Sequence, residues 1–325
     1  MSEMYKLLIS WKGSVQEPVC TSKITIKRVF GLNASTMEFE CVKDDELNYG
    51  EGAGVVLLKD GKRIFSGYIF KKSRDKKQII KNLCYDQLRY MKNKDTFLFE
   101  DLSYSDILRK ICNHQGLMTG DIEDTGYIIP GRVERNKEYF SMLKSAYDIT
   151  LAHTGVIFTL FDDAGKICLK KPQSMLVNDA ITFDNACNFS YTTSIENSYN
   201  RVKLSHIDDK SKEVKSYVKE DVNHIKEWGL LQYFDESSDV DKLEGQASGL
   251  FELLNKKERT LEIKNAIGNW DIRGGSLVPV IFNAIGDIVV NSVMFVAEVI
   301  HNIEGDHHFM DLKVYNKDIL PRGGK

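Results

Sequence analysis

HNIEGDHHFMDLKVY, residues 301–315, decides how the last part of this chain folds, and it contains three of the chain's seven histidines. His301, His307 and His308 lie close to Glu304 and Asp306. Imidazole and carboxylate groups are the ligands of a catalytic zinc ion, so the stretch first suggests a metal site.

The same letters are typical of a β-hairpin. An apolar strand would end at His301, residues 302–306 would form a polar turn that contains a glycine, and a second strand would follow. Neighbouring side chains on a strand point to opposite faces, so His307 and His308 cannot easily converge on one ion. We therefore predict a hairpin without a metal ion or other cofactor, in which His301 and His308 are cross-strand neighbours.

The strand that leads into this hairpin, NSVMFVAEVIH at 291–301, is apolar on both of its faces. We expect one face to pack in the core and the other to meet a second subunit. The residues predicted to contact another subunit or another protein are Val293, Phe295, Val299, His301, His308 and Met310.

The first part of the chain shows the same β pattern. Six strand-sized segments rich in β-forming residues lie within about the first eighty residues, and Asp60-Gly61 supplies a hairpin turn. So many short strands predict a small closed sheet, because an open one would leave its edges exposed. We predict a first β-barrel domain over residues 1–83.

The periodicity then changes to that of helices. In LSYSDILRKICNH, Ser103 caps a helix with one apolar face, and a second helix over 137–154 ends before Gly155. Two strands follow, joined by a turn at Ala164-Gly165. Residues 84–183 are therefore predicted to form an α+β module.

Alternating strands return after this module. We predict a second β-barrel domain over residues 184–318, with a helix inserted at about 240–256, and a tail at 319–325. The expected fold class is mainly β with an α+β insertion, and two small β-barrel domains per chain.

The amino-acid composition argues against several classes of function. The 325 residues are 42% apolar and 28% charged with a net charge of −3, which is typical of a folded protein and not of one that binds nucleic acid through a basic surface. The six cysteines are scattered singly and predict reduced core residues of a protein made in a reducing cytoplasm. No stretch is long and apolar enough for membrane insertion, and the start of the chain is unlike a signal peptide.

Motifs of catalysis are missing from the sequence. It has no G-x-S-x-G elbow, no H-E-x-x-H and no phosphate-binding glycine loop that opens a helix. The basic stretch KKSRDKK at 71–77 is predicted to be a solvated hairpin tip. We expect a structural or assembly component, not an enzyme.

Four stretches in a fixed order carry a resemblance to a known family. They are FSGYIFKKSRDKKQIIKNLCYDQLRYM at 65–91, IENSYNRVKL at 195–204, EWGLLQYFDESSDVDKLEGQASGLFELLN at 227–255, and the hairpin at 301–315. Their order resembles that of the baseplate hub proteins of contractile phage tails and phage-tail-like bacteriocins. In particular, it resembles the XkdQ/YqbQ branch found in defective prophages, which is related to late control protein D.

The resemblance implies a mechanical role. Hub proteins of this kind form a homotrimeric ring that adapts a hexameric tail tube to a trimeric central spike and continues the lumen of the tube. The implied partners are the tail tube protein, the central spike protein and other baseplate and tape-measure components. The implied location is the baseplate of a virion or phage-tail-like particle assembled in the bacterial cytoplasm.

Two other classes of function stay open. A tail-associated peptidoglycan hydrolase would need a cleft with a coupled carboxylate pair or zinc. A surface-binding β-protein would need exposed aromatic residues, and the three tryptophans are too far apart in the sequence to decide this.

Overall fold

The computed structural model describes residues 5–316, apart from 75, 187, 208–212, 238–239, 241–242 and 286–287. The chain is mainly β, with 51% of residues in strands and 21% in helices. The described residues form two compact units. The first holds residues up to 189 together with 262–314, and the second holds 190–261 and the residues that follow 314.

The elements of the first unit begin with a β-rich segment. It contains β1 (Tyr5–Trp11), β2 (Ser14–Gln16), β3 (Ile24–Val29), β4 (Thr36–Val42), β5 (Gly54–Lys59), β6 (Lys62–Arg74) and β7 (Ile79–Tyr85). The next segment contains η1 (Gln87–Lys92), β8 (Lys94–Phe99), β9 (Leu102–Ser103), α1 (Tyr104–Gln115), β10 (Thr119–Ile122), β11 (Ile128–Ile129), β12 (Arg132–Glu138), α2 (Tyr139–Thr154), β13 (Thr159–Asp162), β14 (Ile167–Lys170), η2 (Pro172–Met175), β15 (Ile181–Thr182) and η3 (Phe183–Asn185). The chain returns to this unit with β21 (Leu277–Ile285), β22 (Ile288–Glu304) and β23 (His307–Asn316).

The remaining elements belong wholly or partly to the second unit. They are β16 (Asn188–Ser194), β17 (Arg201–Ile207), β18 (Val214–Glu220), α3 (Val222–Trp228), β19 (Gln232–Glu236), α4 (Leu243–Leu254) and β20 (Glu258–Ile267).

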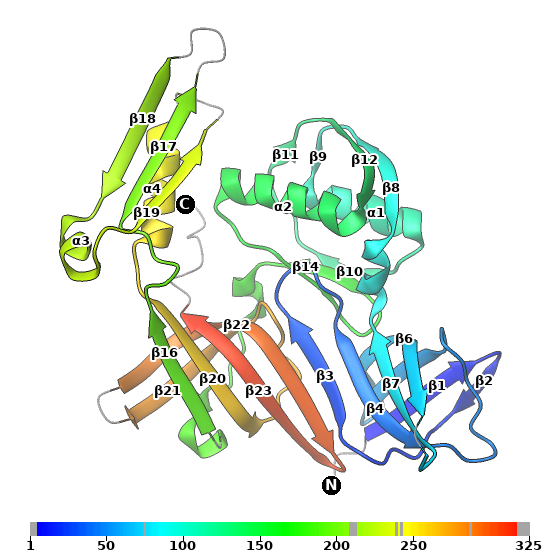
Figure 1. The fold of residues 1–325 in the computed structure, drawn as a ribbon. Helices are drawn as coiled ribbons and strands as arrows, with labels where there is room; N and C mark the ends of the chain where they lie inside the picture. The colour runs from blue at the N-terminus through cyan, green and yellow to red at the C-terminus, as the bar shows by residue number, and fades with distance from the viewer. Residues whose placement is uncertain are drawn as a thin grey trace. The chain divides into compact units, whose positions relative to one another are not determined.

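One sheet of 13 strands organises the first unit (Figure 1). Its order is β16-β20-β23-β22-β3-β4-β7-β6-β5-β1-β2; off this path, β21 pairs with β22 and β15 pairs with β21. The sheet is continuous because β22 pairs with β3 in an antiparallel register that runs from Glu298↔Val29 to Ile303↔Ile24. Strands from the predicted β-domains 1–83 and 184–318 therefore share one set of backbone hydrogen bonds.

The mainly β prediction with a helical insertion is confirmed, but closure into barrels is not found. None of the sheets formed by the described residues is closed into a barrel. Barrels were expected because closure of a sheet removes its exposed edge strands. The chain instead extends one sheet, so that strands such as β3 and β22 cover each other's edges.

Hairpin turns fall where the sequence predicts them. Asp60 and Gly61 both have positive φ, at 49° and 80°, and they join β5 to β6. Ala164 and Gly165 do the same between β13 and β14. The closing turn is shorter than predicted. It consists of Gly305 and Asp306 alone, because residues 302–304 continue β22, where Asn302 and Ile303 pair with β3.

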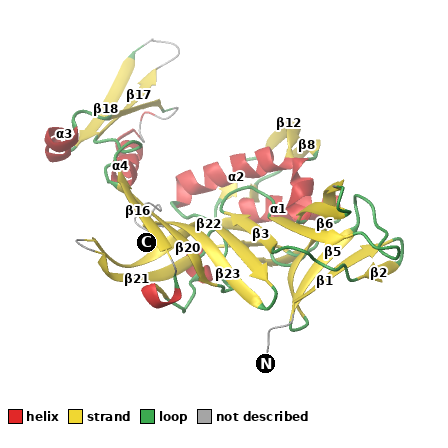
Figure 2. Cartoon of the chain, turned by 60° about the horizontal axis from the view of Figure 1, so that its bottom comes forward, coloured by secondary structure: helices red, strands yellow, loops and turns green. Residues whose placement is uncertain are grey.

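The helical module has its own core. Ser103 accepts a hydrogen bond from the Asp106 N–H at the start of α1, and α2 ends before Gly155, as predicted. Gly116 after α1 and Gly155 after α2 both have the left-handed conformation. The two helices lie side by side in both views (Figures 1 and 2). Their buried faces share one cluster that includes Tyr104, Ile111, Tyr139 and Leu143.

The second unit is a three-stranded sheet, β18-β17-β19, with α4 against one face. Its core consists of Val202, Leu204, Leu243, Ala247 and Phe251. The helix predicted at about 240–256 is confirmed as α4, whereas α3 was not predicted. The predicted tail at 319–325 lies outside the described residues. Within the part of the chain that is described, no helix is long and apolar enough to cross a membrane.

A close backbone approach supports the pairing of β22 with β3. Gly275 N–H donates to the Val296 carbonyl, and Phe30 N–H donates to the Ala297 carbonyl, so the loop before β21 lies against both strands. A Cβ atom on Gly274 would lie 2.3 Å from Phe30 N and 2.4 Å from Val29 C. Only glycine fits at this position, because the obstructing atoms belong to the backbone.

We predict that Gly274→Ala lowers the free energy of unfolding by about 1–3 kcal/mol, because the new methyl group forces the loop away from the β3–β22 pair. Gly249→Ala in α4 is the control. A Cβ there meets nothing within 4 Å, and alanine favours a helix, so that variant should be neutral or more stable by about 0.5–1 kcal/mol. Denaturant unfolding followed by circular dichroism checks both. An unchanged midpoint for Gly274→Ala would contradict the role assigned to this approach.

Candidate functional site

The histidines of the closing hairpin meet as predicted. His301 Nδ1 lies 3.0 Å from His308 Nε2. Trp270 packs against both rings, with its centroid 4.6 Å from that of His301 and 4.0 Å from that of His308, nearly parallel to each. Trp270 Nε1–H donates to the Tyr5 hydroxyl over 3.2 Å. The hairpin histidines are therefore part of an aromatic cluster that also holds the first strand.

The hydrogen bonds of His301 determine its protonation. Its Nε2 lies 3.1 Å from the Ile272 carbonyl, which can only accept, so Nε2 carries the proton. Nδ1 is then free to accept from His308 Nε2–H. Full burial, together with the positive charge of Arg28 and the neighbouring His308, holds the pKa of His301 well below its usual range. His301 is a neutral, fully hydrogen-bonded group.

This arrangement does not suit a metal ion. Both nitrogens of His301 are already used, and His307 is exposed at the start of β23, away from the pair. Among the described residues, no group of three histidine, cysteine, aspartate or glutamate side chains could hold a metal ion.

Arg28 is a buried charge next to the aromatic cluster. Its guanidinium lies 5.7 Å above the Trp270 ring, and its Nη2 donates to the Ile64 carbonyl over 2.8 Å. Burial, and next the charge of Arg273, lower the pKa of Arg28 to about 9. Arg273 itself donates to Asp163 over 2.9 Å and stacks on Phe161.

Two buried carboxyl groups face these arginines. Asp86 follows β7, caps η1 by accepting from Leu88 N–H, and accepts from Ser35 N–H over 2.8 Å. Burial, and next the charge of Asp162, raise the pKa of Asp86 to about 8. Burial also raises the pKa of Asp162. In the described structure Arg28 Nη1 is buried without a hydrogen-bond partner.

Some of these buried residues could have been predicted from the sequence and others could not. Arg28 falls in phase with Ile24 and Ile26, which alternation places on the inner face of β3, so a buried arginine could have been expected there. Trp270 could not have been expected at the hairpin, nor Asp162 near Arg28, since nothing in their local sequence indicates either approach.

The six residues predicted for an interface are mostly inside this chain. Phe295, Val299, His301 and Met310 are buried, and Phe295 packs edge-to-face on Phe30. Val293 and His308 keep part of their surface exposed. A contact with another subunit through β22 and β23 stays a prediction, and the exposed surface of Val293 and His308 is accessible for such a contact.

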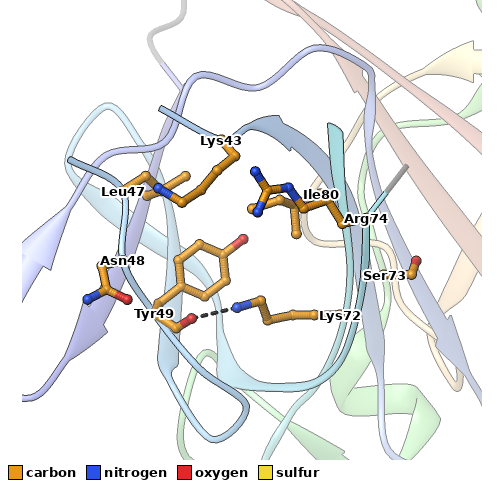
Figure 3. Close-up of a pocket in the computed structure, with 8 residues that line it drawn as sticks. All are labelled: Lys43, Leu47, Asn48, Tyr49, Lys72, Ser73, Arg74 and Ile80. Carbon is orange, nitrogen blue, oxygen red and sulfur yellow. Dashed lines mark hydrogen bonds between the residues drawn. The ribbon is translucent and has the colours of Figure 1, made fainter. Parts of the chain in front are cut away.

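A pocket of about 180 Å³ lies between the loop that follows β4 and the strands β6 and β7 (Figure 3). Lys72 Nζ donates to the Tyr49 carbonyl over 2.5 Å and lies 4.3 Å from the centre of the Tyr49 ring. Lys43 and Arg74 complete a lining with three positive charges, and none of the eight lining residues is acidic. The basic stretch 71–77 was predicted to be a solvated tip. This prediction is confirmed, because the stretch joins β6 to β7 and its described residues are exposed except for the half-buried Lys72. Lys72, Ser73 and Arg74 also line the pocket.

A larger hollow, of about 730 Å³, lies beside Arg273. Its charges are largely used within the chain, because Lys170 pairs with Asp121 at 2.7 Å and Arg273 pairs with Asp163. These acidic groups therefore serve as ion-pair partners.

Comparison with known proteins places this architecture in a family. The YQBQ-like family model matches residues 24–315. The phage-like element PBSX protein XkdQ of Bacillus subtilis is 28% identical over 279 residues, which cover 84% of each chain.

Solved structures share the fold. The prophage MuSo2 43 kDa tail protein from Shewanella oneidensis superposes with a TM-score of 0.72 at 12% identity, over 97% of this chain and 99% of that one. The E. coli c3393 protein superposes with a TM-score of 0.56 at 10% identity, over 98% and 80%. It is a component of the type VI secretion system with structural similarity to the T4 tail proteins gp27 and gp5.

We predict a pH signature for the buried histidine. Unfolded His301 takes up a proton near pH 6.5, whereas the folded residue stays neutral, so the unfolded state binds more protons and stability falls as pH falls below about 6.5. His301→Gln should be less stable than the parent at pH 7, and this deficit should shrink toward pH 5 by up to about 1.4 kcal/mol per unit.

Ile303→Val on the same strand is the control for this experiment. It removes one buried methylene and no ionisable group, so it should cost about 1 kcal/mol at every pH. Denaturant midpoints across the pH range give the comparison. A deficit for His301→Gln that stays constant with pH would contradict the assignment of a neutral His301.

Proposed function

The chain belongs to the YQBQ-like family and has the fold of phage tail proteins, and from this premise we propose that it is a structural baseplate hub. The observation that carries the proposal is the match of almost the whole chain, both to the family model and to a prophage tail protein. Its place would be the baseplate of a contractile tail or a phage-tail-like particle.

The proposed hub is a homotrimeric ring. Each subunit contributes two β-rich regions, so that three subunits present six to a hexameric tail tube, while the threefold axis matches a trimeric spike. The c3393 protein, which shares this fold, belongs to the type VI secretion system and is structurally similar to the T4 tail proteins gp27 and gp5. This likeness supports a role at a tube–spike junction. Tube, spike and other baseplate or tape-measure components are the proposed partners.

The continuous sheet supports this role mechanically. A force applied to either β-rich region is carried to the other by the backbone hydrogen bonds of β22 and β3 rather than by a flexible linker. A component that holds a tube on a spike has to transmit load in this way. The proposal assigns the protein no enzymatic activity, and its structural likeness to prophage tail proteins supports this.

We expect the purified protein to have the mass of three chains by light scattering, alone or once spike or tube protein is added. Negative-stain images should then show a threefold ring. A stable monomer that forms no ring with either partner would overturn the proposal. So would clearing of peptidoglycan suspensions that disappears in Glu304→Gln or His308→Gln, because that result requires a hydrolase.

The predicted interface strand gives a second test. Val293→Glu places a charge on a partly exposed apolar position of β22 and should weaken trimer formation at least tenfold, because a buried, unpaired charge costs more than about 1.4 kcal/mol. Asn291→Glu adds the same charge at an exposed position two residues away and should leave the trimer intact. Sedimentation at several concentrations measures both. Equal effects of the two variants would remove Val293 from the interface.

A further inference from the structure

Cys20 and Cys41 face each other across the sheet. They are partners in an isolated antiparallel bridge between the segment before β3 and strand β4. Thr21 N–H donates to the Glu40 carbonyl and Val42 N–H donates to the Val19 carbonyl, each over 3.0 Å. These two bonds flank the cysteines, so the pair occupies a non-hydrogen-bonded position of the ladder.

This position brings two side chains unusually close. Opposite residues at a non-hydrogen-bonded site have Cα atoms about 4.5 Å apart, and their side chains leave the sheet on the same face. A disulfide requires a Cα separation of about 4.4–6.8 Å. The backbone therefore already has the spacing that a bond between the two sulfurs needs.

Both thiols are free and lie at one apolar cluster. Cys41 is buried in it, while Cys20 is partly exposed and packs at its edge. Cys41 Sγ lies 3.3 Å from the Tyr49 hydroxyl and 3.6 Å from Asn82 Nδ2. Among the cysteines that the structure describes, no other two are registered strand partners.

We propose that Cys20 and Cys41 are the site of a cross-strand disulfide that closes when the chain meets a low-molecular-weight disulfide such as oxidised glutathione. The Cys20 thiolate attacks that disulfide and releases one thiol. The Cys41 thiolate then attacks the Cys20 sulfur of the mixed disulfide and releases the second. Two cysteine thiols are oxidised and one small disulfide is reduced to two thiols.

The order of these steps follows from exposure. Cys20 is the sulfur that a small reagent can reach, and Cys41 resolves the adduct from inside the cluster. Burial raises the pKa of Cys20 to about 12 and also raises the pKa of Cys41, so thiolate is scarce and the reaction is slow at neutral pH. In a reducing cytoplasm the pair stays open.

The bond would link the segment before β3 covalently to β4. It closes a loop of about 20 residues, and that loop contains β3, the strand that pairs with β22. A covalent link from the start of this loop to β4 restricts the unfolded chain more than the folded one, which stabilises the folded state. The inference does not depend on the proposed hub role.

The test compares the reduced chain with the chain treated with oxidised glutathione at mildly alkaline pH. We expect the intact mass to fall by two hydrogens, a Cys20–Cys41 cross-linked peptide in a non-reducing digest, and a rise in Tm of roughly 5–10 °C that dithiothreitol reverses. Cys20→Ser should lose all three effects, and Cys41→Ala provides a second variant. Cys168→Ser should keep them.

Three results would overturn the proposal. One is a glutathione adduct that persists on Cys20, because Cys41 then fails to reach it. Another is a folded chain that shows no cross-link in the parent protein. The third is a cross-link that leaves Tm unchanged or lower, because the bond would then fail to stabilise the folded state. Failure of ring formation tests the hub role separately and has no bearing on these readouts.

Discussion

The pairing of β22 with β3 is the constraint on which the rest of the structure depends. Residues 24–29 and 298–303 are separated by most of the chain, yet they form an unbroken antiparallel ladder. Without it, both strands would leave a row of backbone groups unpaired, and apolar residues such as Ile26 and Ile303 would lose their cover. The ladder joins the first and last β-rich regions into one sheet and places the loop at Gly274 against them.

The same ladder assembles the polar cluster. Arg28 pairs with Val299 and His301 pairs with Ile26, so a buried cation and a buried imidazole come to lie on the face where Trp270 packs. A neutral histidine suits this place, because it satisfies two hydrogen bonds without adding a charge next to the arginine. A slip of one residue would turn His301 to the opposite face and leave its partners unsatisfied. The cluster therefore specifies the register of the ladder that creates it.

Local structure could be predicted from the sequence, and long-range structure only in part. The Asp60-Gly61 turn, the Ser103 cap and the contact of His301 with His308 follow from short-range rules, because a turn or cap residue forces the geometry of its neighbours. The pairing of β22 with β3 has no local sequence signal of this kind, since either strand could pair with many others. Two barrels were expected because each β-rich region was considered alone. The basic pocket beside Tyr49 was missed for the same reason, since Lys72 and Arg74 on β6 meet Lys43 and Tyr49 from the loop that follows β4.

The late position of β22 has a consequence for how the protein is made. β3 is synthesised among the first thirty residues, but one of its two edges has no partner until residue 303 has left the ribosome. Contacts between residues so distant in sequence form slowly, and an open strand edge can pair with a neighbouring chain in the meantime. A chain interrupted before the closing hairpin keeps that edge open permanently. The sheet is therefore fully bonded only in a chain that already contains β22 and has paired it with β3.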